Sequence, residues 1–158
     1  MSKYEHIKDE SVRGALEDYK EKIDELKPDE LSLSTYKVEK PWGHEVWLEM
    51  NEFYALKLIH FKQGNRCSLQ LHERKVESVY VLEGEAEVFL ENDEGVMESS
   101  VYGPGTGWTV PVNKKHRVHA KTDFTILEAQ SPHLNDIIRF QDDSNRTSGT
   151  IKEEHEGN

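Results

Sequence analysis

The stretch of sequence that decides the fold is residues 64–84, GNRCSLQLHERKVESVYVLEG. Alternate residues of an extended strand share a face, so Gln70 and His72 point to the same side. Glu77 then opens a β-prone run, and a turn between the two strands brings its carboxylate toward the same point. Gly84 permits a tight reversal. The stretch therefore predicts paired strands with three polar side chains converging inside a barrel.

His116 supplies a fourth converging side chain. It follows the turn-like Asn113-Lys114-Lys115 and begins another alternating strand. Two imidazoles, a carboxylate and an amide oxygen form a mixed nitrogen and oxygen set, which suits Zn, Mn, Fe, Co or Ni. Cys67 is the only cysteine, which excludes a thiolate cluster or an internal disulfide. Each of these residues taken alone could equally serve the fold, but Gln70, His72, Glu77 and His116 together form a candidate site for a divalent metal ion.

Hydrophobic residues alternate with a period of two from about residue 36 onward, which predicts an all-β sandwich or barrel over residues 36–146. The N-terminal extension, 1–35, instead carries a helical pattern from Asp9 to Leu26 that Pro28 ends. The tail, 147–158, is polar and is expected to be flexible. Besides the alternating run at 54–61, we expect strands at 45–49, 66–71, 77–83, 85–91, 96–102, 106–111, 116–120, 124–130 and 137–140.

The composition of the chain limits the kinds of partner that it can bind and the compartment in which we expect it. The formal net charge of −11 and the absence of a Lys/Arg cluster argue against nucleic-acid or anionic-membrane binding. The N-terminus lacks the apolar core of a signal peptide and no apolar run is long enough to span a bilayer, so we expect a cytoplasmic protein. Barrels of this type expose edge strands that favour pairing, and we expect a homodimer.

The spacing of these residues resembles the two sequence motifs of the cupins. The first motif, G-x5-H-x-H-x4-E-x6-G, is matched from Gly64 to Gly84, with Gln70 where the first histidine would stand. The second, G-x5-P-x-G-x2-H-x3-N, is matched at Gly105, Pro111 and His116, whereas Asn113 and Ala120 depart from it. The resemblance implies a cupin double-stranded β-helix, or jelly-roll barrel, with the N-terminal helix as an addition.

Four segments, 38–45, 68–72, 128–131 and 136–140, are similar to the type II mannose-6-phosphate isomerase cupin domain. That family implies aldose–ketose isomerisation of a sugar phosphate, and related isomerases use a Gln, His, Glu, His zinc set, which favours zinc here. Its domain occurs alone or fused to a mannose-1-phosphate guanylyltransferase. The sequence departs from the family just after Glu77 and in the shortened stretch before Asp136, so mannose 6-phosphate itself does not follow.

Several other residues are candidates for substrate chemistry. An isomerase needs a base that moves a proton between two carbons, and Lys57, Glu128 and His119 are candidates because strands of the same barrel carry them. Arg66 and Arg139 match family positions, and a guanidinium suits a phosphate or carboxylate. Trp42, in a Pro-Trp-Gly turn, could stack on a sugar ring, whereas Trp108 is expected in the core.

Two other classes of function remain open. A non-catalytic cupin could sense a metabolite in the same pocket, which the departures from the motifs favour. A non-haem dioxygenase could use two histidines and one carboxylate to hold Fe(II). Metal content, oxygen uptake and hexose-phosphate turnover separate these three functions.

Overall fold

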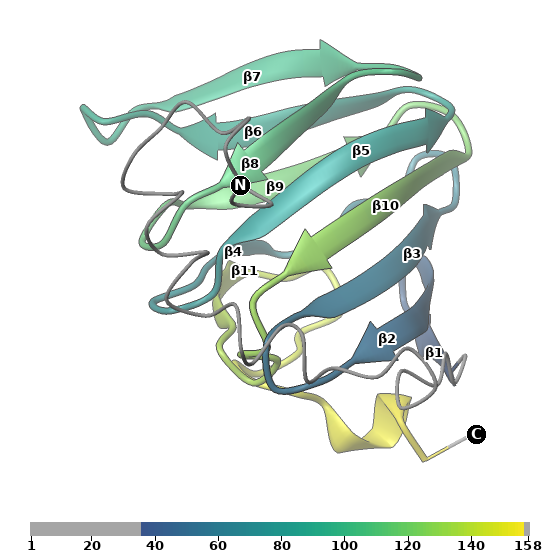
Figure 1. The fold of residues 1–158 in the computed structure, drawn as a ribbon. Coiled ribbons are helices and arrows are strands. Elements are labelled where there is room, and N and C mark those ends of the chain that lie inside the picture. Colours follow the sequence, from purple (N-terminus) through teal and green to yellow (C-terminus); the bar gives the residue numbers. More distant parts are fainter. Residues whose placement is uncertain (1–35, 157–158) are drawn as a thin grey trace, which may run out of the picture. The chain divides into compact units, whose positions relative to one another are not determined.

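Two antiparallel β-sheets face each other in the computed structural model, which describes residues 36–156 (Figure 1). The six-stranded sheet has the order β1 (Tyr36–Lys40), β2 (Gly43–Met50), β3 (Ala55–Phe61), β10 (Phe124–Gln130), β5 (Glu77–Glu83) and β8 (Gly107–Val110). The five-stranded sheet has the order β11 (Ile138–Gln141), β4 (Leu69–Leu71), β9 (His116–Ala120), β6 (Ala86–Glu91) and β7 (Met97–Tyr102). The all-β prediction is confirmed.

The core lies between the inner faces of the two sheets. Along β10 every second residue is buried, and Phe124 and Ile126 are almost completely shielded from solvent. Burying a side chain of this size stabilises the fold by roughly 1.5–3 kcal/mol. Trp42 stacks on Phe61 with ring centroids 4.2 Å apart. The apolar side chains give way to polar ones along the same inner faces, for Lys57 on β3 and Glu128 on β10 are also buried.

Two glycines allow close approaches of the backbone that any side chain would block. A Cβ atom at Gly43 would lie 1.9 Å from the carbonyl oxygen of His60, which β2 approaches in its pairing with β3. Gly84 has a φ of 78°, and a Cβ there would lie 1.9 Å from the carbonyl oxygen of Asp123. Gly84 therefore makes the reversal between β5 and β6 possible, as expected from the sequence.

The C-terminal segment, residues 143–156, packs against the barrel. Gly149 donates its N–H to the carbonyl oxygen of Ile137, just before β11, at 2.8 Å. The carboxylate of Glu154, in the short 3-10 helix η2 (Lys152–Glu154), lies 2.7 Å from the ammonium of Lys40 on β1. The segment thus connects the edge strands of the two sheets (Figure 1). Charged residues of the segment therefore pair with opposite charges that are distant in the sequence.

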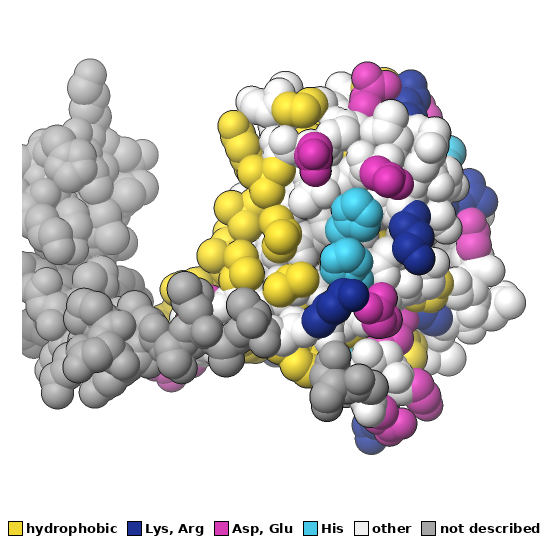
Figure 2. Space-filling view, turned by 90° about the vertical axis from the view of Figure 1, so that its right-hand side faces the viewer, with side chains coloured by type: hydrophobic (Ala, Val, Ile, Leu, Met, Phe, Trp, Pro, Cys, Tyr) yellow, Lys and Arg dark blue, Asp and Glu magenta, His cyan; other side chains and the backbone are white. Residues whose placement is uncertain are grey.

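Three further observations concern the N-terminal extension, the outer surface of the barrel and membrane-spanning helices. The helix expected over Asp9–Leu26 lies outside the described residues. On the outer side of β5, Tyr80 and Leu82 are about half exposed, and Figure 2 shows hydrophobic side chains gathered along one side of the view. The described part of the chain contains no helix with the length and apolarity needed to span a membrane.

Candidate metal centre and cavity

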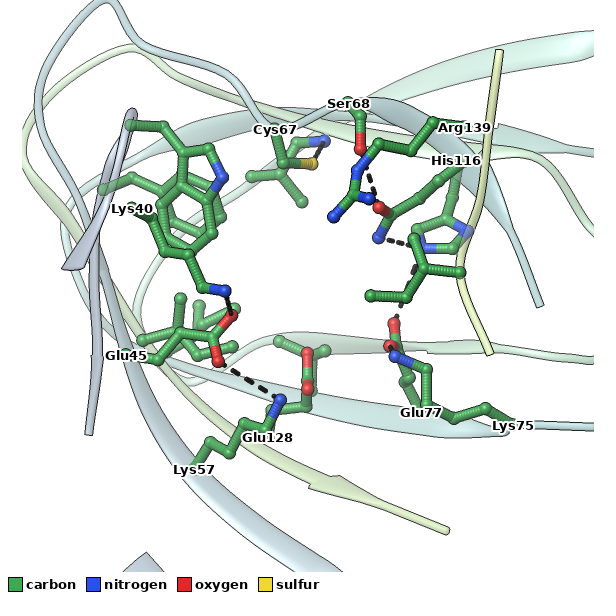
Figure 3. A pocket seen from close by; sticks show the side chains of 18 of the residues that line it. Lys40, Glu45, Lys57, Cys67, Ser68, Lys75, Glu77, His116, Glu128 and Arg139 are labelled. Carbon is green, nitrogen blue, oxygen red and sulfur yellow. Dashed lines mark hydrogen bonds and ion pairs between the residues drawn. The ribbon is translucent and has the colours of Figure 1, made fainter. Parts of the chain in front are cut away.

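A cavity between the two sheets holds most of the polar side chains that the sequence singles out (Figure 3). It offers about 80 Å³ to the centres of water-sized molecules, which is room for several waters. Its polar lining comes from both sheets and from the C-terminal segment: Lys40, Glu45, Lys57, Ser68, Gln70, Lys75, Glu77, His116, Glu128, Arg139 and Arg146.

Three potential metal ligands meet at one end of the cavity, and we call them the His–Glu cluster: His72, Glu77 and His116. Glu77 opens β5, His116 opens β9, and His72 directly follows β4. Nε2 of His72 lies 3.1 Å from Oε1 of Glu77, and Nε2 of His116 lies 3.5 Å from its Oε2. One ligand atom from each residue can be chosen so that all lie within 4.8 Å of one another. All three side chains are buried.

The backbone fixes the orientation of both imidazole rings. Nδ1 of His72 donates to the carbonyl oxygen of Asp136 at 2.5 Å, and Nδ1 of His116 donates to that of Lys114 at 3.1 Å. Because each ring donates from Nδ1, Nε2 is the nitrogen of each ring that faces Glu77 and that a metal ion could bind. Nε2 of His72 is buried without a hydrogen-bond partner despite its closeness to the carboxylate. A buried imidazole nitrogen without a hydrogen-bond partner, 3.1 Å from a carboxylate oxygen, fits a site for a bound cation.

The carboxylate of Glu77 is ionised. Burial alone would raise its pKa, but the ammonium of Lys75 at 2.6 Å holds that pKa well below its usual range. A second carboxylate supports the turn that carries Lys75. Asp136 accepts the backbone N–H groups of Glu73, Arg74 and Lys75 at 3.1, 2.7 and 2.8 Å. Asp136 therefore holds the turn with its side chain and His72 with its carbonyl group.

Gln70 lies beside the cluster, because it is the register partner of His116. Its Oε1 accepts a hydrogen bond from Ser68 at 2.7 Å, and its Nε2 lies 3.4 Å from Nε2 of His116. Amide nitrogen is not a metal ligand, so Gln70 fits the fourth position only after its amide turns by about 180°. The hydroxyl of Ser68 could then accept from Nε2.

A second group of charges, which we call the Lys–Glu network, lies across the cavity from the cluster and consists of Lys40, Glu45 and Lys57 (Figure 3). Oε2 of Glu45 lies 3.2 Å from Lys57 and accepts from Trp47 at 2.8 Å, while Oε1 lies 3.9 Å from Lys40. Burial opposes ionisation of Glu45, but the two ammonium groups outweigh it and lower the pKa to about 2. Burial would lower the pKa of Lys57, but Glu45 and Glu128 raise it.

Glu128 lies between these two groups of charges (Figure 3). Burial, followed by the repulsion of Glu77, raises its pKa to about 8, and the nearby Lys57 and Lys75 only partly offset these effects. The Glu128 carboxyl group is therefore mostly protonated at neutral pH. Cys67 also lines the cavity. Burial raises the pKa of its thiol to about 11, and its sulfur accepts the N–H of Val118 at 3.2 Å.

The cavity gathers most, but not all, of the residues singled out in the sequence. Lys57, Glu128, Arg139 and Trp42 line it together with Gln70, Glu77 and His116, and His72 is completely buried beside its cluster partners. Sequence reasoning missed four charged side chains that also line the cavity: Lys40, Glu45, Lys75 and Arg146. Glu45 had an available signal, because it lies in the family-like segment 38–45 and alternates with Gly43.

His119, a sequence candidate for the base, and Arg66, a sequence candidate for anion binding, do not line this cavity. Both line a separate hollow with Arg117, Phe89 and Met97. His119 is three residues from the inward-facing His116, so the alternation of β9 turns it outward. Arg66 forms an ion pair with Asp143 at 2.7 Å and is about half exposed.

Solved structures place this architecture in a class. Oxalate decarboxylase from Bacillus subtilis aligns with a TM-score of 0.60 and 20% identity, over 68% of this chain and 30% of that one. KdgF from Halomonas sp. aligns with a TM-score of 0.54 and 24% identity, over 68% of this chain and 93% of that one. Likeness at this level of identity shows the fold alone, and the fold is that of the cupins.

A family assignment follows from the sequence. Residues 27–142 match the family described as mannose-6-phosphate isomerase C-terminal, and the chain belongs to this family. XanB, a xanthan biosynthesis protein of Xanthomonas campestris pv. campestris (strain B100), is 30% identical over 145 residues, which is 85% of this chain and 29% of that protein. The mannose-1-phosphate guanylyltransferase of Escherichia coli (strain K12) is 25% identical over 82% of this chain and 28% of its own length.

A third relative has the same relation to the chain. AlgA, an alginate biosynthesis protein of Pseudomonas putida (strain KT2440), is 31% identical over 73% of this chain and 24% of that protein. The chain therefore spans less than a third of each of these relatives. What it shares with them is one cupin domain of proteins whose names refer to polysaccharide or sugar-nucleotide synthesis.

Proposed function

We propose that this chain is a metal-dependent cupin that acts on a sugar phosphate or a related carbohydrate, by aldose–ketose isomerisation of the mannose-6-phosphate isomerase type. The observation that carries the proposal is the arrangement of the His–Glu cluster, which borders a cavity that also holds a protonated carboxyl group, Glu128, and several cationic side chains. Membership of the mannose-6-phosphate isomerase C-terminal family supports the same reaction.

The proposed cofactor is a divalent metal ion, with zinc as the first candidate. The donor set fits such an ion, because two imidazole nitrogens and one carboxylate converge and Nε2 of His72 lacks a partner. His72, Glu77 and His116 would hold the ion, and Gln70 could complete the set through its amide oxygen. When bound, the ion would supply Lewis-acid polarisation of a substrate carbonyl oxygen.

The proposed proton carrier is Glu128. In aldose–ketose isomerisation a base takes the proton from C2 and returns it to C1, while a hydroxyl proton moves from O2 to O1. A carrier must exchange protons near neutral pH, and the pKa of Glu128, about 8, meets this requirement. Lys57 is the weaker candidate because its raised pKa and its ion pair with Glu45 keep it protonated. Lys57 would instead favour the ionised form of Glu128.

Arg139 and Trp42 are the proposed substrate-binding residues. The guanidinium of Arg139 projects into the cavity (Figure 3), where it could bind the phosphate of a sugar phosphate. Trp42 forms part of the cavity wall and is already stacked on Phe61, so one face of its ring is occupied by the core. Arg66, outside the cavity, has no part in this proposal.

A non-catalytic metabolite-binding cupin is the second candidate. It is favoured by the pairing in the Lys–Glu network, which neutralises cavity cations that a reaction could otherwise use.

A homodimer and a cytoplasmic location complete our proposal. Light scattering after gel filtration tests the dimer, and a monomer at high concentration would contradict it.

The decisive experiment combines metal analysis with turnover of hexose phosphates. We expect zinc or manganese to copurify and the protein to interconvert an aldose phosphate with its ketose. Replacing Glu128 with Gln should lower kcat by roughly 100-fold or more and leave metal content unchanged. The control is Glu87→Gln. Glu87 lies on β6 and is the register partner of His119, outside the cavity.

Two results contradict the isomerase proposal. Metal-loaded protein that binds hexose phosphates without interconverting them indicates the metabolite-binding function. Copurified iron with substrate-dependent oxygen uptake indicates a dioxygenase instead. Full activity of the Glu128→Gln variant would remove Glu128 as the proton carrier.

A further inference from the structure

The C-terminal segment lies beyond the part of the chain that matches the family, residues 27–142, yet it contributes to the cavity. Arg146 lines the cavity and forms ion pairs with Asp142 at 2.7 Å and Glu154 at 3.1 Å. Glu154 also pairs with Lys40, another lining residue. Near the end of the segment, a hydrogen bond of 3.0 Å joins Nδ1 of His155 and the hydroxyl of Tyr36 on β1. The segment thus closes one side of the cavity, between β11 and β1.

The same segment holds Arg139 in place. Nη1 of Arg139 donates to the carbonyl oxygens of Thr147 and Gly149, the second at 2.8 Å. The backbone N–H of Arg139 donates to the hydroxyl of Ser148 at 3.1 Å. Carbonyl oxygens orient a guanidinium but do not neutralise its charge. The C-terminal segment therefore fixes the direction of the Arg139 side chain and leaves its positive charge available.

The charge of Arg139 distinguishes it from the other cations of the cavity. Lys75 pairs with Glu77, Lys57 with Glu45, and Lys40 and Arg146 with Glu154. Within residues 36–156, Arg139 is the one cavity-lining Lys or Arg that makes no ion pair, and its Nε is buried without a hydrogen-bond partner. A positive charge of this kind, oriented and unpaired, is suited to an anionic ligand group.

We propose that the C-terminal segment is a specificity-determining element that builds an oxoanion-binding subsite around Arg139, on the cavity wall that also carries His116. The ligand class is a small molecule with a phosphate or carboxylate at one end and metal-binding oxygens at the other. In naming the substrate's anionic end, this inference rests on the proposed function. Arg139 and His116 both face the cavity (Figure 3), so one small molecule can contact both ends of such a site.

Binding of inorganic phosphate to metal-free protein tests the subsite without involving the metal. We expect calorimetry to detect phosphate binding by the full chain in the presence of a chelator. Arg139→Gln should weaken it about tenfold or more, and Arg139→Lys should weaken it less, because the charge remains but the fork is lost. The control is Arg66→Gln, which removes an arginine outside the cavity and should change affinity by less than about twofold.

A glycine substitution tests the role of the segment itself. Gly149 has a φ of 85°, and a Cβ there would lie 3.0 Å from Oδ1 of Asn135, which accepts the N–H of Thr150. Gly149→Val should shift the Gly149 carbonyl group away from Arg139 and weaken phosphate binding about threefold or more. The control is Gly105→Ala, at a φ of 82° with nothing within 4 Å of the added Cβ.

The results separate this inference from the proposed function. Wild-type protein that does not bind phosphate, or an Arg139→Gln variant with unchanged affinity, overturns the subsite even if hexose phosphates are interconverted. Unchanged affinity in the Gly149→Val variant overturns the role of the segment. Weaker phosphate binding by both the Arg139→Gln and the Gly149→Val variants, with both controls normal, supports the subsite even if no sugar phosphate is turned over.

Discussion

The cavity contains two groups of buried polar side chains, the His–Glu cluster and the Lys–Glu network. They differ in how completely their members are paired by ion pairs and hydrogen bonds. In the network, Glu45 has two ammonium partners and an indole N–H, and Lys40 gains Glu154 as well. In the cluster, Nε2 of both histidines lies close to one carboxylate, and that of His72 makes no hydrogen bond. Buried charge is tolerated when it is paired, so the network can serve the fold, whereas the cluster leaves a buried imidazole nitrogen that can bind a cation.

The largest effect should come from removing a ring of the cluster. His72→Ala and His116→Ala should each abolish stoichiometric metal binding and leave a folded barrel, because each removes one of three fixed ligands. Elemental analysis of purified protein gives the stoichiometry, and circular dichroism reports the fold. His44→Ala is the control, since His44 stacks on His60 away from the cavity. If both cluster variants retain full metal content, the ligand assignment is wrong.

Breaking the network should reduce stability and leave metal binding intact. Glu45→Gln leaves the buried ammonium of Lys57 without its counter-charge and should lower the free energy of unfolding by about 3 kcal/mol. Urea denaturation measures the change. The double replacement Glu45→Leu with Lys57→Met should recover most of the loss. The matched control is Glu39→Gln, because Glu39 pairs with Lys37 at the solvent-exposed surface. Equal effects of the two Glu→Gln variants would contradict the distinction.

A smaller effect on metal binding is expected from removing the side chain that supports the turn beside the cluster. Asp136→Ala removes the carboxylate that accepts three backbone N–H groups at 73–75 and should weaken metal affinity by about tenfold. Competition with a chelator of known affinity measures the change. Asp123→Ala is the control, since its carboxylate accepts the N–H of Gln63. An unchanged affinity in the Asp136→Ala variant would show that the turn does not need this support.

The most gradual effect is a pH dependence of stability that Glu128 should impose on metal-free protein. The pKa of Glu128 is raised to about 8 in the folded state, from an ordinary 4.5. Between these values the folded state binds more protons than the unfolded state, so stability falls as pH rises from about 4.5 to about 8. The groups that face Glu128 are Lys57 from β3, Glu45 from β2, Glu77 at the start of β5 and Lys75 just before β5.

Comparison with Glu128→Gln isolates this contribution. The stability of wild type relative to the variant should fall by about 1 kcal/mol per pH unit over that range, as measured by urea denaturation at pH 5, 6, 7 and 8 with chelator present. Parallel pH profiles for the two proteins would show that Glu128 does not bind a proton in this window.

The fold and the cluster could be predicted because their signals are local. Alternation within single strands gives the inward faces, and the spacing from Gln70 to Glu77 spans only one strand, one turn and the next strand. The cupin-like spacing then adds His116. The structure confirms the all-β prediction, and the family match confirms the resemblance. The ligand role of these residues stays a prediction.

The differences between expectation and structure have separate physical causes. The outward position of His119 follows from its odd spacing to His116, a signal that was available in the sequence. Arg66 shares its parity with Ser68, but regular pairing is interrupted between Arg66 and β4, so alternation fails there and both Cys67 and Ser68 are buried. The contact between Lys40 and Glu154 joins residues 114 positions apart, which no local pattern encodes.

The buried thiol of Cys67 can be used to follow access to the cavity by chemical modification. A buried thiol with a pKa of about 11 is almost entirely protonated at neutral pH, and only the thiolate reacts rapidly with alkylating reagents. Its sulfur and its carbonyl group bind Val118 and Arg117, so separation of β9 from the chain that precedes β4 would expose the thiol further. Because Cys67 also lines the cavity, ligands that fill the cavity should slow modification of this single cysteine.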